Sequence, residues 1–221
     1  MPVALKKYEV DFSSDRATKI GWPTFMEKEI HEQPDAVGAT LADRIDSFGH
    51  LALDEVRIPE SVLRSVDKVI MIGCGTASYA GQVARYAIEH WCRIPVEIEL
   101  AHEFRYRDPI VSEKTLTVAI SQSGETMDTI KAVRHAREQG SKVLAIVNTY
   151  GSTIAREADA VLYTHAGPEV AVASTKAFTT QLAALFLLTL VLAKMRGHLS
   201  PERESDLLAQ MRHLPAAMKH V

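Results

Sequence analysis

One short segment of the chain concentrates side chains that can hold an anion. Ser121-Gln-Ser-Gly-Glu-Thr126 carries three hydroxyls and a carboxamide, and it follows an apolar run and opens a helical pattern. The start of a helix supplies unpaired N–H groups and a partial positive charge, and Gly124 lets the backbone approach a ligand closely. No Lys or Arg lies in the segment, so it predicts a phosphate site built from neutral donors. The alternative is a Ser/Thr helix cap without a ligand, although a cap needs fewer hydroxyls.

A second glycine-containing segment, Gly73-Cys-Gly-Thr-Ala-Ser78, also joins an apolar run to a helical pattern. It resembles the start of a dinucleotide-binding G-x-G-x-x-G motif, with Glu97 and Glu99 as acids for a ribose. Ser78 replaces the third glycine, and an incomplete motif is weak evidence for NAD binding. In the alternative interpretation, Thr76 adds a hydroxyl to the phosphate site. The segment is also compatible with a tight turn capped by Thr or Ser.

A third segment, residues 167–176, leads into the most apolar part of the chain. We expect Ser174 or Thr175 to cap the following helix, and the segment to form a wall beside a ligand. Lys176 is expected to be solvated or packed on the helix. The nine histidines show no metal-binding spacing, so no metal and no cofactor is predicted. Cys74 is expected to be a packed thiol rather than a nucleophile, because no His or Lys lies nearby to activate it.

Strands and helices must bring these segments together. Short apolar runs predict strands over 68–73, 95–100, 116–121, 142–147 and 160–164, and helical patterns predict helices over 77–91, 126–139 and 174–195. This alternation predicts an α/β fold, a flavodoxin-like three-layer αβα sandwich around a roughly five-stranded parallel sheet. In such sheets, ligands bind at the carboxyl ends of strands where the strand order reverses. The polar segments should therefore meet at that edge.

The ends of the chain lack this alternation. We expect residues 1–22 to be a linker or extended arm, 23–58 to form helices that pack on the domain, 59–200 to form the α/β domain itself, and 201–221 to form a further helix. A first short helix should begin near Phe25 and stop before Pro34. A second helix should end at Gly49 and carry on one face Val37, Leu41, Ile45 and Phe48.

The bulk composition is typical of a soluble globular protein. The chain has 221 residues, 47% hydrophobic and 24% charged, with a formal net charge of −3. Without a basic excess, no nucleic-acid partner is expected. Two cysteines without a CxxC pair, and no signal-type apolar stretch, indicate a reducing, cytoplasmic location. The apolar run 182–193 is shorter than the ~18 residues of a membrane span, so we expect a buried core helix and no membrane partner.

Taken together, these segments resemble one family. Ser121-Gln-Ser-Gly-Glu-Thr126 and Val172-Ala-Ser-Thr-Lys-Ala-Phe178 are similar to two characteristic segments of the isomerase part of the glutamine–fructose-6-phosphate aminotransferases, also called glucosamine-6-phosphate synthases. Phe25-Met-Glu-Lys-Glu-Ile-His-Glu-Gln-Pro34, Gly73-Cys-Gly-Thr76 and Glu103-Phe-Arg-Tyr-Arg107 are similar too. The resemblance is to the first of two sugar-isomerase (SIS) domains and covers nearly the whole chain, from about residue 20 to 200. It implies that residues 59–200 are this SIS domain and that the helix 201–221 leads to the second one.

The resemblance implies an enzyme that makes glucosamine 6-phosphate from fructose 6-phosphate and glutamine. It implies that the sugar phosphate is bound by Thr76, Ser121, Gln122, Ser123, Thr126 and Val172. Weaker expectations fall on Gly75, Ala77, Ser78, Gly124, Ala173 and Ser174. Family members often carry Ser where this chain has Ala77, so one contact is absent or Ser78 replaces it.

The resemblance also places the acid/base Glu, the ring-opening His and the Schiff-base Lys in a second SIS domain, and a catalytic Cys in a glutaminase domain. Neither domain is recognisable in this sequence. We therefore expect a fragment with no catalytic residue and no turnover of its own, which works with those two domains and as a homodimer. The alternative is a non-catalytic module that senses phosphosugars, but no helix-turn-helix of a regulator is evident.

Overall fold

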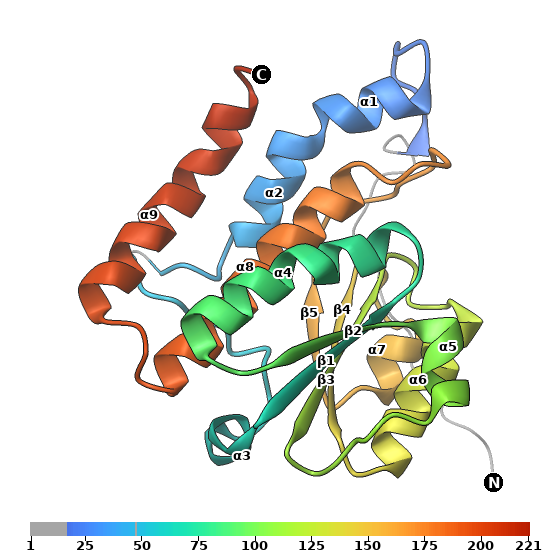
Figure 1. The fold of residues 1–221 in the computed structure, drawn as a ribbon. Coiled ribbons are helices and arrows are strands. Elements are labelled where there is room, and N and C mark those ends of the chain that lie inside the picture. Colours follow the sequence, from blue (N-terminus) through green and yellow to red (C-terminus); the bar gives the residue numbers. More distant parts are fainter. Residues whose placement is uncertain (1–16, 47) are drawn as a thin grey trace, which may run out of the picture.

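A computed structural model describes residues 17–46 and 48–221 of the chain (Figure 1). A five-stranded parallel sheet lies at its centre, in the order β2-β1-β3-β4-β5. The strands are β1 (Lys68–Gly73), β2 (Val96–Leu100), β3 (Thr115–Ser121), β4 (Lys142–Val147) and β5 (Ala160–Tyr163). This order is that of flavodoxin-like folds. Helices cover both faces, which confirms the predicted three-layer αβα sandwich.

Each face of the sheet has its own hydrophobic core, because successive side chains of a strand point to opposite faces. On β1, Val69 and Met71 belong to the larger core, whereas Ile70 and Ile72 belong to the other. The larger core is covered by α4 (Thr76–Cys92) and α8 (Lys176–Met195), and the other by α5 (Ala101–Arg107), α6 (Met127–Glu138) and α7 (Thr153–Glu157). Figure 1 shows these two sets of helices on opposite sides of the sheet.

The predicted core helix is α8, which packs against α4 and the sheet. By length and composition, α8 is the one helix among the described residues that could cross a membrane. In the fold, 67% of its most apolar window is buried. The apolar character of α8 is therefore accounted for by core packing.

A further layer lies over α8 and consists of N-terminal and C-terminal helices (Figure 1). These are α1 (Phe25–His31), α2 (Gln33–Leu41) and α9 (Pro201–Met218). The hydroxyl of Thr24 caps α1 by accepting a hydrogen bond from the Glu27 N–H (3.1 Å). The predicted linker over residues 1–22 falls mostly outside the described residues.

The prediction that the second helix extends to residue 49 is wrong. α2 ends at Leu41, and Asp43 adopts a positive φ of 62°. Arg44 turns inward, where its guanidinium donates a hydrogen bond to the Thr40 carbonyl (2.8 Å) in place of a further helical turn. Phe48 is therefore 83% exposed and not part of a packed helical face.

The short helices α3 (Glu60–Ser65) and α7 were not predicted. They contain six and five residues, which is too short for a helical pattern of apolar residues to show in the sequence.

Candidate functional site

The polar segments meet in one cleft at the carboxyl ends of β1 and β3. From these neighbouring strands the chain continues toward opposite edges of the sheet, which is where such sheets bind ligands. The cleft has a volume of about 270 Å³. Its lining is Cys74, Thr76, Ala77, Ile120, Ser121, Gln122, Ser123, Thr126, Thr129, Glu169, Ala171, Val172, Ser174 and Gln181.

The cleft brings together most of the residues expected to bind a ligand. All six of the stronger expectations line it, together with Ala77 and Ser174. Gly75, Ser78, Gly124 and Ala173 do not line it. Ser78 is buried and donates its hydroxyl to the Gly75 carbonyl (2.7 Å). Ser78 therefore does not replace the hydroxyl that is absent at Ala77.

The serine-rich loop between β3 and α6 turns at Gly124, whose φ of +66° favours glycine. The Ser121 hydroxyl accepts a hydrogen bond from the Gly124 N–H (3.0 Å), and the Ser123 hydroxyl accepts one from the Glu125 N–H (3.2 Å). Each hydroxyl keeps its own O–H for donation to a ligand. Thr126 is the N-cap residue of α6, but its side chain makes no cap hydrogen bond. The loop hydroxyls are therefore not spent on capping the helix.

The loop is held from behind by the segment that follows β4. The Ile154 N–H donates to the Gly124 carbonyl (3.0 Å), and the Thr153 N–H donates to the Glu125 carboxylate (2.7 Å). Hydrogen bonding from the side chain and backbone of Thr153 lowers the pKa of the Glu125 carboxyl. A Cβ atom at residue 124 would lie 2.1 Å from Ser152 Oγ. Both the backbone conformation and this close approach require glycine.

Two helices begin at the cleft, and both starts are open. α4 begins at Thr76 and α6 at Met127, and neither receives a side-chain cap hydrogen bond from its N-cap residue. The first N–H groups of a helix have no partner inside the helix, and the helix dipole adds partial positive charge. Among the described residues that line the cleft there is no Lys or Arg, and Glu169 is the only acid. An anion here would be held by neutral donors, as predicted from the sequence.

The third wall of the cleft is organised by Glu169, not by the expected Ser174 or Thr175 cap. The Thr175 N–H (2.9 Å) and the Ala177 N–H (3.0 Å) both donate to one carboxylate oxygen of Glu169. The Ser174 hydroxyl donates to the other oxygen (3.0 Å). A carboxylate is favoured at a helix start because of the helix dipole. That prediction is therefore corrected: Glu169 caps α8 and is engaged by the protein itself.

The same wall is tied to helix α1. Glu29 is 1% exposed, and its carboxylate accepts hydrogen bonds from the Val170 N–H (2.6 Å) and the Ala171 N–H (3.2 Å). Lys176 is also buried and pairs with Glu32, which follows α1, at 2.7 Å. Lys176 is therefore packed rather than solvated, and it does not line the cleft.

The cleft contains residues that the sequence did not predict as site residues, namely Cys74, Ile120, Thr129, Glu169, Ala171 and Gln181. Thr129 had a local signal, because it lies three residues after Thr126 and so on the same face of α6. Cys74 is half-buried and faces the cleft, whereas a packed thiol was expected; Cys92 is buried. Gln181 lies in an apolar helix and had only its polarity as a signal.

The acids that a dinucleotide site would need are otherwise engaged. Glu99 pairs with Arg107, and Glu97 pairs with Lys68 at 3.5 Å. Neither glutamate lines the cleft. The geometry therefore gives the NAD interpretation no support.

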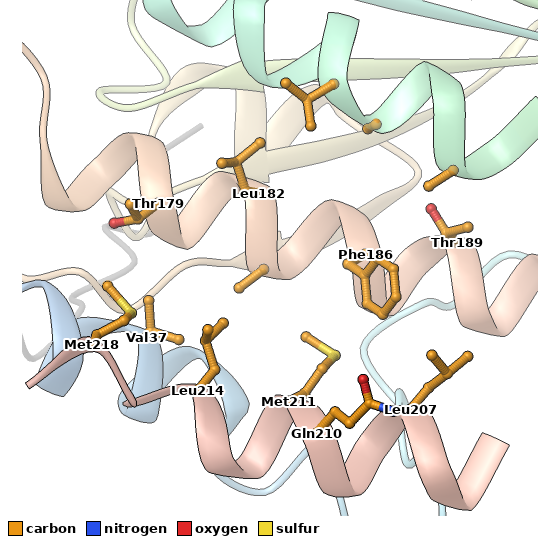
Figure 2. Close-up of a pocket in the computed structure, with 14 residues that line it drawn as sticks. Val37, Thr179, Leu182, Phe186, Thr189, Leu207, Gln210, Met211, Leu214 and Met218 are labelled. Atoms are coloured by element: carbon orange, nitrogen blue, oxygen red, sulfur yellow. The ribbon is translucent and has the colours of Figure 1, made fainter. Parts of the chain in front are cut away.

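A larger hollow of about 570 Å³ lies between α8 and α9, with α2 and α4 at its sides (Figure 2). Figure 2 shows Phe186 of α8 and Met211 of α9 facing one another across it. No titratable side chain is among its lining residues. Within the described residues there is also no group of three or more metal-binding side chains. Of these two hollows, the smaller cleft is therefore the one that gathers the hydroxyl-bearing loop residues.

Sequence comparison assigns this chain to a known class. Residues 62–191 match the SIS domain family, and the chain belongs to that family. More particularly, it is 62% identical over 216 residues to the glutamine–fructose-6-phosphate aminotransferase [isomerizing] of Corynebacterium glutamicum, covering 98% of this chain and 35% of the relative. It is 60% identical over 220 residues to the enzyme of the same name from Streptomyces coelicolor, covering 100% and 36%. The resemblance inferred from the motifs is confirmed.

The solved structures agree with the sequence comparison. The C-terminal domain of glucosamine-fructose-6-phosphate aminotransferase from Francisella tularensis superposes with a TM-score of 0.86 at 38% identity, covering 90% of this chain and 56% of that one. The chain spans about a third of the length of the curated relatives it matches.

Proposed function

We propose that this chain is the sugar-phosphate-binding SIS domain of a glutamine–fructose-6-phosphate aminotransferase, and that its cleft holds fructose 6-phosphate or glucosamine 6-phosphate. The observation that carries the proposal is the gathering of Ser121, Gln122, Ser123 and Thr126 with Thr76 at two open helix starts. The names and high identity of the relatives support the same assignment.

The phosphate group would lie against the serine-rich loop. Phosphate oxygens only accept hydrogen bonds, and Ser121, Ser123 and Thr126 each have an O–H to donate. The start of α6 adds N–H groups and partial positive charge. Val172 and Ser174 stand on the facing wall, where the carbon chain of the sugar would extend.

The contribution of this domain would be positioning. Fixing the phosphate sets where the reacting carbons lie, and orientation of this kind lowers the barrier of a reaction. Proton transfer between C1 and C2 needs a correctly placed carboxylate. Glu169 is the only carboxylate among the described lining residues, and it already accepts hydrogen bonds from Ser174, Thr175 and Ala177. In the proposal, no residue of this chain is catalytic.

The catalytic residues would come from a second SIS domain, and ammonia from a glutaminase domain, in a homodimeric enzyme. A cytoplasmic location belongs to the same proposal and is supported by two free cysteines in the described chain. The chain by itself is expected to form no glucosamine 6-phosphate. Measurable formation by the purified chain would contradict the assignment of catalysis to other domains.

Isothermal titration of the chain with fructose 6-phosphate, fructose and NAD tests the proposed ligand. We expect binding of fructose 6-phosphate only. Ser123→Ala and Thr126→Val should each weaken it by about 1–3 kcal/mol, because each leaves a phosphate oxygen without a donor. Ser205→Ala, at an exposed serine on α9, is the matched control and should change nothing. Equal affinity for fructose, or full affinity in Ser123→Ala, would contradict the proposed role of the loop.

A further inference from the structure

Gln181 is a buried polar residue that the protein leaves without a hydrogen-bond partner. It lies on α8, is 3% exposed, and lines the cleft but not the larger hollow of Figure 2. No described residue donates to or accepts from its carboxamide. By contrast, the buried hydroxyls of Thr180 and Thr189 on the same helix bond to carbonyls of their own helix, at 3.0 and 2.8 Å.

With no hydrogen-bond partner among the described residues, the Gln181 carboxamide is left to bind solvent or a ligand. Among the described residues, Ser152 Oγ is the one side-chain atom that is both fully buried and without a hydrogen-bond partner. The unpartnered amide atoms of Gln181 are therefore not fully buried. The cleft is the hollow through which a partner can reach it.

Gln181 and the serine-rich loop border two different parts of the cleft. α6 packs on one face of the sheet and α8 on the other. The loop that begins α6 therefore borders the cleft from one face, and Gln181 borders it from the other. A ligand whose phosphate lies on the loop would reach Gln181 with the atoms that lead away from the phosphate.

The chemistry of the two parts also differs. The loop offers hydroxyl donors and N–H groups, which suit phosphate oxygens. A carboxamide both donates and accepts, which suits hydroxyl groups, since these also do both. Ala77 and Ile120 lie in the same lining and offer no polar side-chain atom.

We propose that Gln181 hydrogen-bonds a hydroxyl or carbonyl oxygen of the sugar and so makes the cleft select a hydroxylated carbon chain over phosphate alone. This proposal rests on the proposed function and adds a residue that reads the sugar. A site built to hydrogen-bond a hydroxyl discriminates strongly against ligands that lack it, because its own polar group is then left unpaired.

The test compares two probes, fructose 6-phosphate and inorganic phosphate, on the chain and on Gln181→Leu. Titration calorimetry should show about a 10-fold loss of affinity for fructose 6-phosphate, the scale of one lost hydrogen bond. Affinity for inorganic phosphate should stay within about twofold, because in the proposal phosphate is held by the loop and not by Gln181. Ser123→Ala should weaken both probes, and Thr189→Val, a buried polar change on α8 away from the cleft, should weaken neither.

The thermal unfolding midpoint separates ligand binding from a structural role. With no protein partner for the carboxamide, Gln181→Leu should leave the midpoint of the free chain unchanged or raise it. A lowered midpoint would show that Gln181 holds the fold together and would overturn the proposal. Unchanged affinity for both probes, or equal losses for both, would also overturn it. If the unmodified chain binds neither probe, the proposed function itself fails, and this inference fails with it.

Discussion

The close approach of Gly124 to Ser152 predicts a specific coupling between these two residues. A Cβ at residue 124 would lie 2.1 Å from Ser152 Oγ and 2.6 Å from Ser152 Cβ. Real Cβ atoms do not come this close, so Gly124→Ala must displace one of the two loops. The next nearest atom, Val147 Cγ1, lies at an ordinary 3.5 Å. Nearly all of the overlap therefore involves the Ser152 side chain.

The magnitude has two parts. Alanine in the left-handed conformation at φ +66° costs about 1–2 kcal/mol. Overpacking of a filled space adds about 1–3 kcal/mol, which gives about 2–5 kcal/mol in total for Gly124→Ala. In a Ser152→Gly background the overlap is gone, and the same change should cost only the backbone part. The double-mutant cycle should therefore give a coupling energy of about 1–3 kcal/mol.

Equilibrium unfolding in urea measures the free energies of unfolding of the unmodified chain, the two single variants and the double variant. An unchanged m-value checks that the four unfolding transitions are comparable. Gly197→Ala is a control, since Gly197 has a φ of +73° and open space around its missing Cβ. It should cost the backbone part alone. The reasoning would be refuted if Gly124→Ala cost the same in both backgrounds, or no more than Gly197→Ala.

Three further predictions follow from single contacts. Burial raises the pKa of the Cys92 thiol to about 12, so only Cys74 of the native chain should react rapidly with Ellman's reagent. Fructose 6-phosphate should slow the reaction of Cys74, and two rapidly reacting thiols would contradict this prediction. Glu32→Ala leaves the Lys176 ammonium buried without this partner and should lower the free energy of unfolding by about 1–3 kcal/mol. This is less than for a fully buried pair, because Glu32 is partly exposed. Lys176→Met should lower the free energy of unfolding by less than Glu32→Ala does, because it leaves no buried charge. Hydrogen bonds from the neighbouring loop lower the pKa of Glu125 below its ordinary 4.5, so its contribution to stability is complete above pH 4.5 and is lost as the pH falls through the lowered pKa. Glu125→Gln should flatten that acid-side loss, and an unchanged acid limb in unfolding curves would count against it.

The sheet and the meeting of the two loops could be predicted because each depends on local patterns. Apolar runs of strand length, each followed by a helical pattern, specify a parallel sheet. The order of the sheet then places the ends of β1 and β3 side by side. Ser121, Thr126 and Thr76 come together for this reason, and their clustering needed no knowledge of side-chain contacts.

The facing wall could not be predicted because it depends on contacts between distant parts of the chain. Glu169 was not predicted as a site residue, although it caps α8 by accepting hydrogen bonds from the Thr175 and Ala177 N–H groups. Glu29 reaches the same wall from more than a hundred residues away. Neither carboxylate has a sequence pattern of its own, so only the folded chain shows which backbone N–H groups each of them accepts.

The end of α2 was missed for a related reason. The apolar spacing from Val37 onward is compatible with a longer helix. The competing element is Arg44, whose guanidinium donates to the Thr40 and Tyr163 carbonyls. The hydrogen bonds that the buried Arg44 donates to these carbonyls outweigh the weak intrinsic preference of the segment for a longer helix.

The central claim, that the loop at residues 121–126 holds the phosphate of a sugar phosphate, is tested most directly by the amide resonances of that loop. The chain would be titrated with fructose 6-phosphate while its backbone N–H signals are followed by NMR. The account predicts that the largest shifts fall on residues 121–127, at the start of α6, and that inorganic phosphate shifts the same signals. Shifts confined to other regions, such as the groove between α8 and α9, or no shift at residues 121–127 when ligand binds, would contradict it.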